Sequence, residues 1–131
     1  MTEIAEPLAK FHAKVTRGGQ FTFPYYTREY YGLSMGDFVE FIVRAKDTNL
    51  RGFFIARLGD KGAITIPKEV RQGLNIKQGD VVELIVVKVY RLKDILGDRI
   101  KVLEDLAARG YKIITSEEER SILYSYSITQ V

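Results

Sequence analysis

Two stretches of this chain, offset by 43 residues, match each other without a gap. Residues 11–44 align with residues 54–87, and most identities fall on turns, prolines and strand patterns. The identical pairs are Phe11/Phe54, Ala13/Ala56, Gly19/Gly62, Thr22/Thr65, Pro24/Pro67, Arg28/Arg71, Gly36/Gly79, Asp37/Asp80, Val39/Val82, Glu40/Glu83, Ile42/Ile85 and Val43/Val86. A stretch of about 35 residues is too small to bury a hydrophobic core alone. The repeat therefore predicts two tandem half-units that pack on each other.

The second stretch reads as one compact unit. Ile64-Thr65-Ile66 alternates apolar and polar residues as a half-buried strand does, and Pro67 stands where a helix can begin. Gly79-Asp80 is a tight-turn signal. Residues 81–87 are rich in β-branched side chains, which predicts a further strand.

The pattern Gly62-Ala63-Ile64-Thr65-Ile66-Pro67, a short basic helix, and then Leu74-Asn75-Ile76-Lys77-Gln78-Gly79-Asp80 resembles the swapped-hairpin DNA-binding domain of the AbrB/SpoVT family, which MazE-type antitoxins share. The resemblance implies a mainly β fold with short helices, in which two half-units exchange hairpins to close a small β-barrel. With both half-units on one chain, we expect the barrel to close within one polypeptide as a pseudo-dimer. Exchange between two chains is the alternative.

The expected organisation has five segments. They are a lead-in at residues 1–10, repeat 1 at 11–44, a polar linker at 45–53, repeat 2 at 54–88 and a C-terminal helical α-β-α extension at 89–131. Apolar spacing predicts helix over residues 91–109, with Gly97-Asp98 as the candidate point of division and Asp98 as an N-cap. Residues 111–115 read as a short strand, and a capping box beginning at Ser116 predicts a second helix. These helices can cover the barrel or pair with another copy.

The search for catalytic chemistry yields little. The absence of cysteine excludes disulfides and thiolate metal sites. The one histidine, His12, falls within a predicted strand and is expected to be structural. Glu104-Asp105 and Glu117–Glu119 read as solvated helix faces or caps, and no nucleophile–base set can be assembled. The sequence predicts no enzyme, no cofactor and no metal.

Composition favours a cytoplasmic protein. The N-terminus lacks a signal-peptide pattern and no apolar run approaches the length of a membrane span. Few Asn, Gln and Met beside many charged residues point to a thermophilic source. The net charge of +3 is spread thinly along the chain, so a DNA surface requires basic residues to gather on one face of the folded molecule.

The resemblance implies which residues meet DNA. Family members use basic residues of the first strand, the following loop, the position after the loop glycine and the helix. The corresponding residues are Lys14, Arg17, Gln20 and Arg28 in the first stretch and Arg57, Lys61 and Arg71, with Lys68 adjacent, in the second. Gln20, an amide, stands at the position after the glycine. Arg28/Arg71 is the preferred pair, because the same base recurs while the helix residues around it diverge. Ala63 departs from the family pattern, in which many members have Arg or Gln.

Four tyrosines distinguish the first repeat. Tyr25, Tyr26, Tyr30 and Tyr31 stand where the second repeat has Lys68, Glu69, Gly73 and Leu74. We expect them to pack the barrel or an interface; stacking on nucleic acid is the alternative.

The leading functional prediction is a DNA-binding transcriptional regulator or nucleoid-associated protein that binds double-stranded DNA specifically or semi-specifically. A homo-oligomer through the C-terminal helices is a further expectation. One alternative is an antitoxin whose C-terminal helices neutralise a toxin, although residues 88–131 carry eight Lys or Arg against seven Asp or Glu, unlike an acidic disordered tail. The other is a barrel that binds a protein partner and no DNA.

Overall fold

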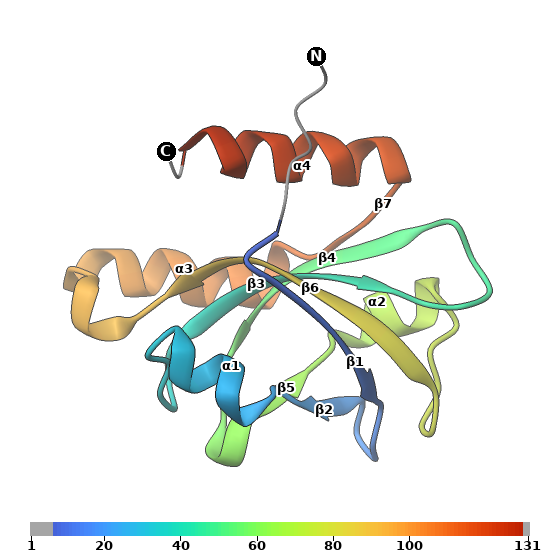
Figure 1. Ribbon diagram of the computed structural model, residues 1–131, viewed down its shortest axis with the longest axis horizontal. Helices are drawn as coiled ribbons and strands as arrows, with labels where there is room; N and C mark the ends of the chain where they lie inside the picture. The colour runs from blue at the N-terminus through green and yellow to red at the C-terminus, as the bar shows by residue number, and fades with distance from the viewer. Residues whose placement is uncertain (1–6, 130–131) are drawn as a thin grey trace.

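The structure, a computed structural model, describes residues 7–129, with side chains as far as residue 125. Its strands are β1 (Ala9–Lys14), β2 (Gln20–Thr22), β3 (Phe38–Arg44), β4 (Arg51–Arg57), β5 (Ala63–Thr65), β6 (Val81–Tyr90) and β7 (Lys112–Ile114). Its helices are α1 (Tyr25–Tyr30), α2 (Lys68–Gly73), α3 (Gly97–Arg109) and α4 (Ser116–Thr129), with short 3₁₀ turns η1 (Asp60–Gly62) and η2 (Leu92–Asp94). One five-stranded antiparallel sheet has the order β1-β6-β3-β4-β7, and β2 and β5 form a separate two-stranded ribbon (Figure 1).

The strands of the two matching stretches alternate in space. β1 pairs with β6, β6 with β3, β3 with β4, and β2 with β5. Each of these ladders joins a strand of the first stretch to a strand of the second. Neither stretch pairs its own strands within the described residues, so each depends on the other for its backbone hydrogen bonds.

The expected closed barrel is wrong: the described strands form an open sheet and a separate ribbon. β2 and β5 are three residues long, and each is followed after one residue by a proline, Pro24 or Pro67. Because proline cannot donate to a ladder, the ribbon strands end there and do not extend to the sheet edges. The ribbon lies across one face of the sheet (Figure 1), and β1 and β7 remain as the edges of the sheet.

The main core fills the space between sheet and ribbon. From the ribbon side, Phe21 and Ile64 are at most 1% exposed. Phe41 of the sheet lies edge to face with Phe21, with ring centroids 5.5 Å apart. Each such buried side chain contributes about 1.5–3 kcal/mol by leaving water, so these rings hold the ribbon on the sheet.

The C-terminal helices cover the other face of the sheet. Leu103 of α3 packs with Phe38 and Ile55, and Leu123 of α4 packs in a second cluster with Ile42 and its neighbours. The extension therefore packs on the sheet of its own chain, one of the two uses that the sequence left open. No helix within residues 7–129 is long and apolar enough to cross a membrane.

Strands extend past three of the predicted segment boundaries. β1 begins at Ala9, inside the predicted lead-in, because Ala9 pairs with Val86. β4 begins at Arg51, inside the predicted linker, since it pairs with both β3 and β7. β6 runs to Tyr90, which pairs with Phe38. The rest of the predicted lead-in, residues 1–6, lies outside the described residues.

Both predicted C-terminal helix starts are shifted. α3 has Leu96 as its N-cap residue, and Asp98 lies in its first turn, where the carboxylate favours the positive end of the helix dipole. The capping box of α4 begins at Thr115, one residue before the predicted Ser116. Thr115 N donates to Glu118 Oε1 at 3.1 Å, and Glu118 N donates to Thr115 Oγ1 at 3.2 Å.

Candidate nucleic-acid interface

The β2–β5 ribbon has one apolar and one polar face. Phe21 and Ile64 face the core as directly paired residues. The neighbouring side chains face outward because side chains alternate along a strand. Gln20 pairs with Thr65 across the ribbon, and its Nε2 donates to Thr65 Oγ1 at 3.2 Å. The outer face of the ribbon therefore carries Gln20, Thr22 and Thr65, with Ala63 opposite Thr22.

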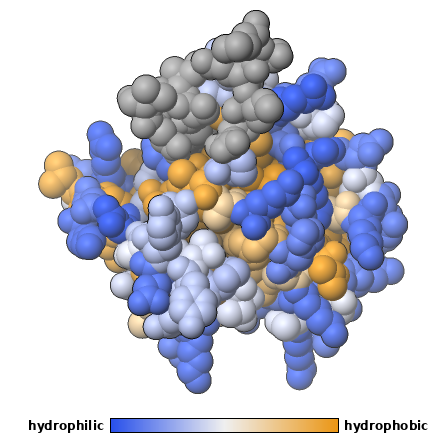
Figure 2. Space-filling view, in the orientation of Figure 1, coloured by the Kyte–Doolittle hydropathy of each residue, from blue (hydrophilic) through white to orange (hydrophobic). Residues whose placement is uncertain are grey.

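A glycine-containing loop stands at each end of the ribbon. The loop after β1 carries Arg17, and the loop after β4 carries Lys61; both side chains are exposed. Lys61 adopts a positive φ of 55°, a region that non-glycine residues rarely enter. Figure 2 shows hydrophilic side chains projecting from the lower edge of the molecule, where the two loops lie in Figure 1. Lys14, at the end of β1, is exposed as well.

Arg28 and Arg71 have a structural use that the sequence did not indicate. Each Nε donates to the carbonyl of the residue just before the proline of its own stretch, at 3.1 and 3.0 Å. Each guanidinium also fills space beside the loop of the other stretch: a Cβ built on Gly62 would lie 2.7 Å from Arg28 Nε, and one on Gly19 would lie 2.3 Å from Arg71 Nε. Both arginines are half-buried. Their contact with DNA stays a prediction.

The two remaining basic candidates differ in their surroundings. Arg57 Nε donates to Gly36 O at 3.0 Å, its Cζ lies 4.9 Å from the centroid of the Phe38 ring, and its Nη1 lies 3.6 Å from a Glu104 carboxylate oxygen of α3. The C-terminal extension thus offsets part of the Arg57 charge. Lys68 is exposed at the start of α2.

Three of the four tyrosines do not pack the core. Tyr25, Tyr26 and Tyr30 are 62%, 81% and 82% exposed, so the expectation that they pack a barrel is wrong for them. Only Tyr31 packs against the core, and its hydroxyl donates to Leu8 O at 2.5 Å. α1 buries none of its own residues, whereas α2 buries Val70.

The acidic side chains of the sheet lie on the face away from the ribbon. Arg44 pairs with Glu83 at 2.8 Å and with Glu119 of α4 at 2.5 Å, and Arg51 pairs with Glu119 at 3.2 Å. The expectation of a solvated Glu119 is wrong, because this residue is 3% exposed. Burial raises the pKa of Glu119, but the hydrogen bonds and charges of Arg44 and Arg51 outweigh it and leave the pKa below its ordinary value. His12 contacts the same cluster, 3.2 Å from Glu83.

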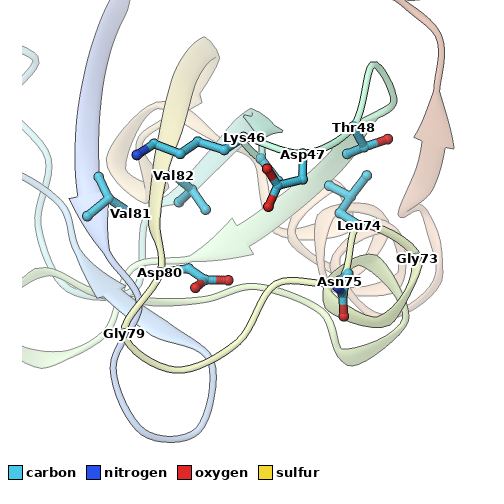
Figure 3. Close-up of a pocket in the computed structure, with 11 residues that line it drawn as sticks. Lys46, Asp47, Thr48, Gly73, Leu74, Asn75, Gly79, Asp80, Val81 and Val82 are labelled. Atoms are coloured by element: carbon cyan, nitrogen blue, oxygen red, sulfur yellow. The ribbon is translucent and has the colours of Figure 1, made fainter.

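A cavity of about 390 Å³ lies beside the linker, between the end of α2 and the turn before β6 (Figure 3). Asp47 and Asp80 approach each other across it, but Asp80 Oδ2 already accepts a hydrogen bond from Lys77 N at 2.9 Å. Within the described residues, no group of three or more His, Cys, Asp or Glu side chains could hold a metal ion. The cavity therefore assembles no recognisable catalytic or metal set.

Comparisons with known proteins show a family model and a solved structure to which this chain is similar. Residues 55–91 match the family model described as "Antidote-toxin recognition MazE, bacterial antitoxin". The solution structure of PHS018 from Pyrococcus horikoshii is similar with 39% sequence identity and a TM-score of 0.61, covering 66% of this chain and 96% of that one. The comparison with curated proteins gave no match. The similarity to the solved structure extends over far more of the chain than the family model does.

Proposed function

We propose that this protein is a regulator that binds double-stranded DNA, because residues 55–91 carry a domain of the MazE/AbrB type, a family of regulators and antitoxins. The observation that carries the proposal is the two-stranded ribbon with a mainly polar outer face and an exposed cation in the loop at each end. The major groove of B-DNA admits a two-stranded β-ribbon. Phosphates on either side of the groove would meet Arg17 and Lys61.

The remaining candidate residues take different roles in this proposal. Lys14 and Lys68 add exposed positive charge for the phosphates, and Gln20 offers an amide on the outer face of the ribbon, where it could read a base edge. Arg28 and Arg71 fix the ribbon and the loops through their Nε atoms, leaving their Nη groups as candidates for phosphate contact. Arg57 would contribute less, because Glu104 already lies 3.6 Å from its guanidinium.

We further propose that the two stretches are tandem copies that form a pseudo-dimer. The alternation of their strands and the reciprocal Arg28–Gly62 and Arg71–Gly19 packing support it. The DNA-facing side chains are nevertheless unequal, since Gln20 corresponds to Ala63. Such a surface would tolerate an asymmetric DNA site better than a true homodimer does. Association with the nucleoid in the cytoplasm follows from the same proposal.

The test is binding to random-sequence duplex DNA across a salt series. The double variant Arg17→Gln/Lys61→Gln is compared with wild type and with Lys93→Gln/Lys101→Gln, which removes two exposed charges near the start of α3 and within it. Losing two phosphate contacts should reduce the slope of log K against log salt by roughly 1.8. The control should keep the wild-type slope. Absence of binding at low salt, or equal slopes for both double variants, would contradict the proposal.

The antitoxin function is a second candidate, favoured by the family description of residues 55–91. Three apolar side chains, Leu96 just before α3 and Val102 and Leu106 within it, are 81%, 58% and 42% exposed and offer apolar surface for a toxin or a second copy. A small nuclease that co-purifies stoichiometrically from native cells, and is lost with Leu96→Ser/Val102→Ser, would establish this function. Sedimentation of the same variant tests self-association.

A further inference from the structure

Strands β1 and β4 correspond through the 43-residue offset, but β4 is covered by β7 whereas β1 is an edge of the sheet. On one edge, β7 pairs with the start of β4, with Gly52 opposite Ile113 and Phe53 opposite Lys112. The residues at the same offset in the first stretch are Ala9 and Lys10, at the start of β1. Within the described residues, no strand pairs with the outer edge of β1.

The corresponding helices α2 and α1 also differ in what packs against them. On the occupied side, Ile113 lies against α2, where a Cβ added to Gly73 would come within 2.8 Å of it. Burial and the neighbouring Glu69 carboxylate raise the pKa of Tyr111, which precedes β7. On the open side, Gly73 and Glu69 are replaced by Tyr30 and Tyr26, which are 82% and 81% exposed.

A hollow marks the open position. A cavity of about 410 Å³ lies between the start of β1 and α1 and is lined by Leu8, Ala9, Tyr26, Thr27, Tyr30 and Tyr31. The open edge also leaves Phe11 partly exposed, whereas its counterpart Phe54 is fully buried. The first stretch thus lacks the cover that β7 and Tyr111 give the second.

The backbone of β1 is oriented to receive a strand. Val15 N donates to Asp80 O at 2.8 Å, and the counterpart Leu58 N donates to Asp37 O at 2.7 Å. Hydrogen-bonded pairs alternate along an antiparallel ladder. Lys10 and His12 therefore direct their N–H and C=O groups away from β6, toward the open edge.

We propose that the open edge of β1 accepts an extended segment of a partner protein as an added strand. By analogy with Ile113, an apolar residue of the segment would lie against the tyrosines of α1. In the register that β7 has on β4, the residue just before it would face Lys10, and the residue three places before it would face His12. Lys10 and His12 are exposed together with Lys14 on the same face of β1. Glu83 Oε2 lies 3.8 Å from Lys10 Nζ, but the Lys10 side chain is still 50% exposed. Acidic residues suit those positions. The β1 strand of a second copy does not, because it would bring like charges together.

This surface is separate from the ribbon and does not depend on DNA binding. Addition of a strand supplies affinity through backbone hydrogen bonds and specificity through alternate side chains. The proposed partner segment is therefore defined by its pattern: two acidic residues separated by one residue, with an apolar residue directly after the second, in an extended conformation.

The test uses the full chain and the synthetic peptide Glu-Tyr-Glu-Ile-Ile-Thr-Ser, which copies residues 110–116 with glutamate in place of Gly110 and Lys112. Amide hydrogen exchange is followed by NMR at a peptide concentration of about 1 mM, suited to weak binding. The amides of Lys10 and His12 should become protected. A peptide with lysine in place of both glutamates should bind more weakly.

Four variants sharpen the result. Tyr30→Ser should weaken binding roughly tenfold by removing a ring contact, whereas Tyr124→Ser, on the exposed surface of α4, should have no effect. Lys10→Pro should abolish binding, since it removes an outward N–H and leaves the β6 ladder intact. Arg17→Gln/Lys61→Gln should bind the peptide as wild type does, which separates this proposal from DNA binding.

Four outcomes would overturn the proposal. They are no protection of β1 amides at this peptide concentration, equal binding by Tyr30→Ser and Tyr124→Ser, and equal binding of the lysine peptide. The fourth is protection of Lys10 and His12 that rises with protein concentration without peptide, which would make a second copy the occupant.

Discussion

The two matching stretches share their internal contacts and differ in what covers them. In both, an aspartate after a glycine closes the turn before the long strand: Asp37 accepts from Ser34 N at 2.8 Å, and Asp80 accepts from Lys77 N at 2.9 Å. The identical residues are those that fix the backbone. Most exposed residues differ between the two stretches. Each stretch therefore has a different surface on the same backbone conformation.

The C-terminal extension accounts for much of the difference. In the second stretch, β7 covers the β4 edge, and α3 brings Glu104 to Arg57. The cavity beside the end of α2 has a counterpart of about 450 Å³ beside the end of α1, lined by Tyr30, Tyr31, Tyr90 and other residues. One extension thus makes two similar halves unequal, leaving the first available for other contacts.

The largest expected effect comes from breaking the reciprocal packing. Gly62→Ala places a Cβ 2.7 Å from Arg28 Nε and 3.0 Å from Phe23 O at a φ of 81°. We expect a loss of about 3 kcal/mol in the free energy of unfolding, combining clash with backbone strain. Gly18→Ala has the same φ with no atom within 4 Å, so strain alone should cost it about 1 kcal/mol. Urea denaturation measures both, and equal losses would contradict the interlocking of the two halves.

A smaller effect is expected from acidification, which acts on the covered face of the sheet. Because the pKa of Glu119 lies below its ordinary value of 4.5, its ion pairs stabilise the fold above that value. This stabilisation is lost as the pH falls through the lowered pKa. The protection of α4 amides, measured as the exchange rate relative to an unfolded peptide at the same pH, should therefore fall on acidification below about pH 4.5, and Glu119→Gln should weaken that dependence. An unchanged dependence in the variant would exclude Glu119 as the responsible group.

The smallest expected effect compares Arg57 with its counterpart Lys14. Arg57→Ala removes an exposed ion pair and a contact with the Phe38 ring, and should cost about 0.5 kcal/mol of unfolding free energy. Lys14→Ala should change stability by less than this. Thermal unfolding of both variants at equal salt measures the difference. Equal losses of unfolding free energy would mean that the contact of α3 with Arg57 adds no measurable stability to the second stretch.

Sequence patterns predicted the local structure and the family well, because both depend on periodicity and turn residues. The strand at Ile64, the helix after Pro67 and the turn at Asp80 all form. The open sheet could not be predicted, since it depends on how far three-residue ribbon strands reach beyond their prolines. The resemblance that suggested a closed barrel rests on residue types at fixed positions along the chain. It does not specify whether the strands at the two edges of the sheet form backbone hydrogen bonds that close a barrel.

The candidate site was predictable only in part. Basic residues near the loops follow from the family pattern, but the Nε bonds of Arg28 and Arg71 depend on carbonyls brought close by folding. Glu119 looked like a cap because it follows Ser116 closely. Its burial arises from Arg44 and Arg51, which lie more than 60 residues away in sequence, and no local pattern signals such a pairing.

The short connection between β3 and β4 has a consequence for how the protein behaves at low abundance. Two separate half-units would have to find each other, and dilution would dissociate them. A flexible tether holds its ends at an effective concentration in the millimolar range. The ladders between the two halves should therefore persist at a few molecules per cell, where a regulator assembled from separate half-units would begin to fall apart.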